Sequence, residues 1–142
     1  MSIIKITKQF SFEMAHALMD YPGKCRNIHG HSYKMEVTVV GETQPDTGMV
    51  MDFKHLKDLV NEVVVNKLDH ALVLSNATDA ELVAALRTHY EKVILVPFQP
   101  SAENMLEHFA ALLKPRLPEH VRLYAIRLRE TETSYAEWRE DQ

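Results

Sequence analysis

Residues 25 to 33 read Cys25-Arg26-Asn27-Ile28-His29-Gly30-His31-Ser32-Tyr33. His29 and His31 are two residues apart, so in a β-strand their side chains leave the same face. Hydrophobic residues continue that face at every second position; they are Tyr33, Met35, Val37 and Val39. Gly30 leaves the opposite side open for another backbone or a ligand to approach. The pattern predicts a strand over residues 31–41 with two histidines at its beginning.

A third histidine, His16, ends an earlier apolar segment and comes alongside the pair if the two segments are neighbours in a sheet. Three imidazoles around one point, with a fourth position open, are typical of a catalytic zinc. A His-X-His pair alone occurs by chance in many strands. The alternative, histidines that only make hydrogen bonds, stays open on spacing alone, although Cys25 and the turn at residues 21–23 strengthen the metal hypothesis.

Composition limits the class of protein. The 142 residues predict one domain, residues 1–142, with 46% hydrophobic and 25% charged residues. A net charge of -4 argues against nucleic acid as the main partner. The sequence has no apolar run of membrane-spanning length and no secretory leader pattern, which predicts no membrane partner. One cysteine cannot form an internal disulfide and is typical of a reducing compartment, so we expect a cytoplasmic location.

The remaining patterns predict an α+β fold with an antiparallel sheet, because hairpin-like strands are followed by helices. The other expected strands cover residues 3–12, 49–51, 93–98 and 121–129. Helical spacing of apolar residues predicts a helix from 53 to about 66, capped by Asp52, and another over 78–90. A third helix opens with Ser101 as its N-cap and stops at Pro115.

Six short motifs together resemble the 6-pyruvoyltetrahydropterin synthase / 6-carboxytetrahydropterin synthase family, and the resemblance covers nearly the whole chain. In order, they are Ala15-His16, Cys25 with His29-Gly30-His31, Gly48-Met49-Val50-Met51-Asp52-Phe53, Leu68-Asp69-His70, Pro100-Ser101-Ala102-Glu103-Asn104 and Glu130-Thr131. The cysteine ahead of the histidine pair is more similar to the bacterial 6-carboxytetrahydropterin branch, which serves queuosine and deazapurine biosynthesis. The chain between Leu74 and Pro100 is longer than in the compact family pattern, and residues 78–98 are expected to form an extra helix-strand segment there.

The resemblance implies the tunnelling fold, an antiparallel sheet with helices on one face that forms a barrel by oligomerisation. It implies a homohexamer whose active sites lie at subunit interfaces. It implies one Zn²⁺ per subunit and the following site. The metal ligands are His16, His29 and His31; the catalytic groups are Cys25, Asp69 and His70; the pterin-binding residue is Glu130, with Ser101 and Glu103 also assigned to the substrate. For Ser101 and Glu103, simple helix capping is an equal alternative.

The activity that the resemblance implies is that of a zinc-dependent lyase. It converts 7,8-dihydroneopterin triphosphate to 6-carboxy-5,6,7,8-tetrahydropterin and releases acetaldehyde and triphosphate. The nearest alternative is a 6-pyruvoyltetrahydropterin synthase, which eliminates triphosphate and keeps the side chain. A non-catalytic pterin-binding oligomer and a protein with a structural zinc are alternatives from other classes. A structural zinc normally recruits an available cysteine as its fourth ligand, whereas a general base stays off the metal.

Overall fold

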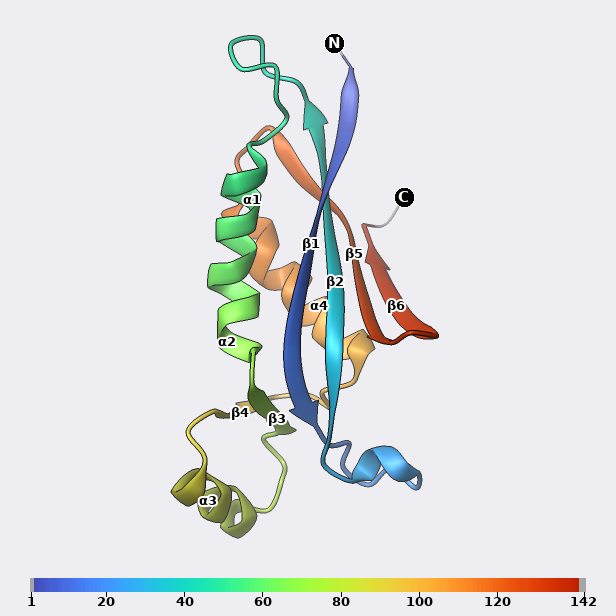
Figure 1. Cartoon of the computed structure of the whole chain (residues 1–142), viewed down its shortest axis with the longest axis vertical. Helices are drawn as coiled ribbons and strands as arrows, with labels where there is room; N and C mark the ends of the chain where they lie inside the picture. Colours follow the sequence, from blue (N-terminus) through green and yellow to red (C-terminus); the bar gives the residue numbers. More distant parts are fainter. Residues whose placement is uncertain (1, 141–142) are drawn as a thin grey trace.

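Two long antiparallel strands form the centre of the fold, which we describe from a computed structural model for residues 2–140 (Figure 1). They belong to a six-stranded sheet with the order β4-β3-β1-β2-β5-β6. The strands are β1 (Ile3–His16), β2 (His29–Glu42), β3 (Ala71–Ser75), β4 (Val93–Val96), β5 (Val121–Thr131) and β6 (Ser134–Arg139). The helices are α1 (Phe53–Val60), α2 (Asn66–Leu68), α3 (Ala80–His89) and α4 (Ala102–Leu113). A π-helical turn (Asn61–Val65) joins α1 to α2, and short 3-10 turns occupy Lys24–Arg26 and Lys114–Arg116.

The sheet is mixed. Strand β2 pairs antiparallel with both β1 and β5, and β6 continues this pattern. Strand β3, however, pairs parallel with the last three residues of β1, and β4 pairs parallel with β3. The helical segment from α1 to α2 connects β2 to β3 and crosses over the sheet, so that β3 runs parallel to β1. The α+β class is therefore confirmed. The sheet is antiparallel only across β1, β2, β5 and β6, whereas β3 and β4 are parallel additions beside β1.

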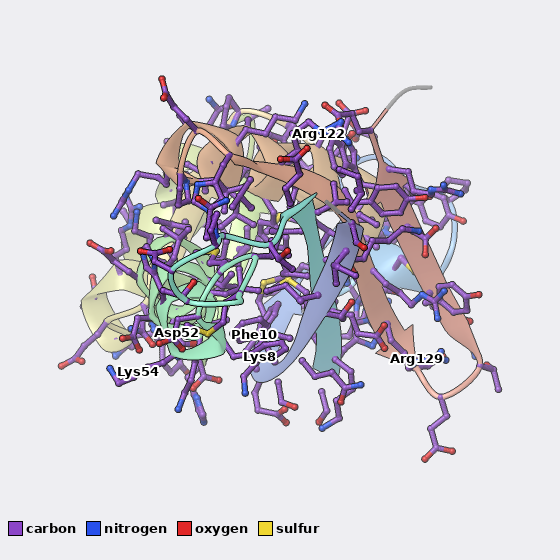
Figure 2. All side chains as sticks on the ribbon, turned by 90° about the horizontal axis from the view of Figure 1, so that it is seen from above. Lys8, Phe10, Asp52, Lys54, Arg122 and Arg129 are labelled. Carbon is purple, nitrogen blue, oxygen red and sulfur yellow. The ribbon has the colours of Figure 1, made fainter. Side chains whose placement is uncertain are left out.

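The central strands have one apolar and one polar face. Phe12, Met14, Tyr33 and Met35 are buried in the core, whereas their neighbours along the strands are exposed or half-buried. Helix α1 packs against β1, and α4 packs against β5 and β6, so helices cover the apolar face. Figure 2 shows charged groups such as those of Lys54, Arg122 and Arg129 at the periphery of the molecule.

The helices begin where their caps predict. The Asp52 side chain accepts a hydrogen bond from the Lys54 amide at 2.8 Å, and helical structure continues to Leu68. The second and third predicted helices correspond to α3 and α4, and the predicted strands 3–12, 31–41, 93–98 and 121–129 to β1, β2, β4 and β5.

The predicted strand over residues 49–51 is wrong. The Gln44 amide donates to the Met49 carbonyl at 2.9 Å, so this carbonyl bonds within its own loop rather than to another strand. Conversely, β3 and β6 were not predicted. Within residues 2–140, none of the helices has the length and hydrophobicity that crossing a bilayer requires.

Candidate metal and pterin site

Three histidines meet at one end of the sheet. His16 is the last residue of β1 and pairs directly with His29, the first residue of β2, while His31 follows on the same face. One ring nitrogen from each histidine lies within 4.8 Å of the other two. His16 is only 2% exposed. The structure thus brings together the three histidines that the sequence singled out, in an arrangement that can hold a metal ion.

Backbone carbonyls fix the orientation of two of these rings. His16 Nδ1 lies 2.7 Å from the Pro100 carbonyl oxygen, and His29 Nδ1 lies 2.7 Å from the Asn27 carbonyl oxygen. A carbonyl only accepts, so each Nδ1 carries the hydrogen and each neutral ring has its lone pair on Nε2. The two Nε2 atoms are 3.1 Å apart. Two lone pairs that face each other at this distance require a cation or a shared proton.

The third ring and the local electrostatics also fit a metal. His31 Nε2 is buried and, among the described residues, has no hydrogen-bond partner. Burial lowers the pKa of His16, against smaller opposing effects of the Pro100 carbonyl and Glu130, which favours the neutral imidazole that binds metals. The carbonyl bonds to His16 and His29 resemble the outer contacts that orient metal-binding histidines. The donor set therefore suits a metal ion that accepts imidazole nitrogen.

Glu130 lies beside this cluster. It follows Leu128 on the core-facing side of β5, and its carboxylate oxygens lie 3.7 Å from His31 Nε2 and 4.0 Å from His16 Nε2. Its side chain is 27% exposed, so a ligand can reach it. Burial and the nearby Glu130 charge raise the pKa of Tyr33, whose hydroxyl therefore stays protonated. The structure places a carboxylate where a molecule bound at the histidines can contact it.

Cys25 lies in the loop between β1 and β2, in the 3-10 turn that leads toward His29. It is a half-buried free thiol, and the potential metal-binding group consists of the histidines without it. The Leu18 amide donates to the Cys25 carbonyl at 2.9 Å. The Gln99 side chain bonds to both the amide and the carbonyl of Met19, at 2.9 and 2.6 Å. Sequence patterns did not indicate Gln99, which ties this loop to the segment before α4.

Asp69 and His70 lie away from the histidine cluster. The His70 backbone amide donates to the Glu13 carbonyl. One oxygen of the Asp69 carboxylate accepts from the Glu13 amide at 2.9 Å, and the same oxygen lies 3.1 Å from His70 Nδ1. The hydrogen bond from Glu13, followed by that from His70, outweighs partial burial and lowers the pKa of Asp69. His70 lines a hollow of about 330 Å³ together with Glu13, Gly30 and Ser32. Glu13, Gly30 and Ser32 alternate with the histidine ligands along β1 and β2, so their side chains are on the opposite face of the sheet, and His31 also contributes to the lining of the hollow. The contacts of the Asp69 carboxylate therefore connect it to Glu13 and His70.

Ser101 caps α4, since its Oγ accepts a hydrogen bond from the Asn104 amide at 3.2 Å. Glu103 is exposed in the first turn of that helix. The capping alternative therefore describes what Ser101 does in this structure, and a substrate contact of either residue stays a prediction. The neighbouring Pro100 carbonyl, which no side-chain pattern could indicate, is the part of this motif that contacts the histidine cluster.

Comparisons with known proteins find similar sequences along nearly the whole chain. The family model described as 6-pyruvoyl tetrahydropterin synthase matches residues 5–141. A Haemophilus influenzae protein named 6-carboxy-5,6,7,8-tetrahydropterin synthase is 36% identical over 97% of this chain and 100% of its own length. An Aquifex aeolicus protein of the same name is 32% identical over 96% of this chain and 98% of its own.

Solved structures show the same fold. Caenorhabditis elegans 6-pyruvoyl tetrahydropterin synthase is similar with a TM-score of 0.71 at 26% identity, over 99% of this chain and 98% of that one. The Plasmodium falciparum 6-pyruvoyl tetrahydropterin synthase structure gives a TM-score of 0.75 at 23% identity, over 98% of each chain. With three clustered histidines and a neighbouring carboxylate on this fold, the chain belongs to the 6-pyruvoyl tetrahydropterin synthase family.

Proposed function

We propose that this chain is a zinc-dependent lyase that converts 7,8-dihydroneopterin triphosphate to 6-carboxy-5,6,7,8-tetrahydropterin, with release of acetaldehyde and triphosphate. The observation that carries the proposal is the pair of Nε2 atoms 3.1 Å apart in rings whose Nδ1 hydrogens are already committed to carbonyls. The names of the curated relatives support the 6-carboxy product. In this proposal, the product has a place in queuosine or deazapurine biosynthesis.

His16, His29 and His31 would hold the zinc, because three neutral imidazoles with an open fourth position suit a catalytic site. When bound there, zinc supplies Lewis acidity that polarises substrate oxygens and acidifies neighbouring C–H and O–H groups. Glu130 orients the pterin by accepting two N–H bonds from its aminopyrimidinone edge, beside the histidines. Each of these side chains comes from the core-facing side of β1, β2 or β5, which are adjacent paired strands in the centre of the sheet.

Protons are moved by the remaining groups. Cys25, which is not among the clustered ligands, acts as the general base on the substrate side chain. His70, supported by the Asp69 carboxylate 3.1 Å from its Nδ1, gives or accepts the second proton. Because His70 lies on the opposite face of the sheet from the histidine cluster, a second copy of the chain completes each site.

The sheet has edges at which copies can join. Strand β3 covers only the last three residues of β1, and β6 forms the other edge of the antiparallel part. Pairing of such edges between copies removes exposed backbone groups and closes a barrel. We therefore propose a homohexamer with active sites at subunit interfaces, acting on a small-molecule pterin triphosphate in the cytoplasm.

Product identification tests the activity. Purified zinc-loaded protein is incubated with 7,8-dihydroneopterin triphosphate, and the products are identified by mass. Acetaldehyde with a 6-carboxypterin supports the proposal. A pterin that keeps its three-carbon side chain and has lost triphosphate indicates the 6-pyruvoyl reaction, and recovery of unchanged, bound substrate indicates a binding protein. Mixing and reassembling inactive His31→Ala and His70→Ala subunits should restore part of the activity if two copies share each site.

A further inference from the structure

We propose that Lys92 is a positioning residue for the Asp69–His70 pair. Its ammonium group binds the backbone carbonyl of Asp69, directly before His70, rather than the reactive atoms of the Asp69 or His70 side chain. The inference rests on the proposed function, in which His70 moves a proton. It assigns a role to the α3–β4 segment, residues 78–98, which the sequence marked only as an extra helix-strand segment.

The helix that ends before Asp69 leaves carbonyl groups without intrahelical partners, as every helix end does. Lys92 Nζ donates to two of the carbonyls in this region, that of Asn66 at 2.8 Å and that of Asp69 at 2.6 Å. A cation at a helix C-terminus also interacts favourably with the helix dipole. Lys92 therefore acts as a cap that fixes the position of the Asp69 carbonyl.

The turn that follows needs such support. His70 has a φ of 65°, in the left-handed region, which costs a non-glycine residue on the order of 1 kcal/mol. Its side chain is 76% exposed, so packing does not hold the imidazole in place. On one side, the Glu13 backbone bonds to the His70 amide and to the Asp69 carboxylate. On the other side, the support is the Lys92 ammonium bound to the Asp69 carbonyl.

Lys92 is itself held by the sheet. It directly precedes β4, and its own carbonyl accepts the Leu72 amide at 2.9 Å, so the two segments are bonded in both directions. Arg87 in α3 donates to the Val93 carbonyl at 3.1 Å and fastens the helix to β4 without contacting Asp69. Arg87 thus offers a matched control: it lies in the same segment and is also a cation bonded to a carbonyl, but its bond is to Val93 rather than to Asn66 or Asp69.

The first measurement is a cycle of variants. Lys92→Met keeps the length of the side chain and removes the ammonium, and it is compared with Arg87→Met, each with normal His70 and with His70→Ala. We expect Lys92→Met to lower kcat by about 10- to 100-fold, as small misplacements of a reacting group do, with KM and zinc content unchanged. With His70→Ala already present, Lys92→Met should lower kcat no further, because it acts through His70. Arg87→Met should keep the kcat of the normal protein.

The second measurement is independent of turnover. Hydrogen exchange of the backbone amide of His70, which bonds to the Glu13 carbonyl, should accelerate in Lys92→Met and not in Arg87→Met, while β1 and β2 keep their protection. Unchanged exchange at His70, or an equal loss of kcat with and without the His70 side chain, would overturn the role of Lys92. A normal protein that is inactive on 7,8-dihydroneopterin triphosphate would overturn the proposed function instead, and exchange at His70 would still decide whether Lys92 positions the turn.

Discussion

Replacement of His31 by leucine should change stability in opposite directions with and without metal. His31 Nε2 is buried and has no hydrogen-bond partner within residues 2–140, and a buried polar atom in that state costs about 1–3 kcal/mol. Leucine has a similar volume and no polar atom, so it removes this cost from the metal-free protein. With zinc in excess, the normal protein gains binding free energy that the variant loses, about 4 kcal/mol at a zinc concentration a thousand times Kd.

The assay is thermal unfolding at about pH 8, above the ordinary pKa of histidine, at one protein concentration, with either chelator or excess zinc. For a chain of this length, about 1–3 kcal/mol corresponds to roughly 3–9 °C in Tm. We expect His31→Leu to unfold above the normal protein in chelator and below it in zinc. His120→Leu is the control: His120 Nε2 bonds to the Val50 carbonyl at 2.9 Å, so its loss should lower Tm equally in both buffers. A lower Tm for His31→Leu in chelator would refute the reasoning, because His31 would then stabilise the fold without a metal.

Four further predictions concern other residues. Cys25→Ala should keep zinc and substrate binding while the single-turnover rate falls by about 10²–10⁴-fold, as loss of an acid–base group does; near-normal turnover would end its role as the base. Glu130→Ala should weaken substrate affinity measured by calorimetry, because pterin N–H donors lose their partner beside the histidines, and unchanged affinity would contradict the anchor. Burial, and to a smaller extent the Lys67 charge, lower the pKa of His108 below its ordinary 6.5. As the pH falls, the unfolded chain therefore binds this proton before the folded chain does. The stability present above pH 6.5 is lost as the pH falls from 6.5 to the pKa of the folded state. In urea titrations with chelator, His108→Leu should flatten this loss, and an identical slope would contradict it. Asp52→Ala should lower the free energy of unfolding by about 0.5–2 kcal/mol, since it removes the cap of α1.

The local arrangement of the site follows from the order of its residues along the chain. Spacing of two along a strand places His29 and His31 on one face, because successive side chains alternate, and no tertiary contact is needed to know it. The caps Asp52 and Ser101 likewise mark helix starts through local contacts. Each side chain accepts a hydrogen bond from a backbone amide two or three residues ahead. The family motifs extended this reading to Glu130, which the structure indeed places beside the histidines.

Strand β3 shows where local patterns stop being informative. Its run Ala71–Ser75 is short and buried at four of five positions, so it shows no alternation, and its parallel pairing with β1 depends on a crossover of the whole α1–α2 helix. Strand β6 was missed although its burial does alternate, because it is a short, largely exposed edge strand. The run at residues 49–51 has the composition of a strand, but a hydrogen bond within its own loop takes up the Met49 carbonyl.

Contacts between segments that are distant in sequence decide how the site is held and divided. The Pro100 carbonyl that orients His16 is 84 residues away in sequence, and any residue's carbonyl could have served, so no side chain signals it. Likewise, the motif Asp69-His70 indicates acid–base chemistry but not its side of the sheet. That side is set by where β3 meets β1 and by the left-handed turn at His70. Pairing across the sheet depends on the packing of the whole chain, and it puts the histidine cluster and His70 on opposite faces.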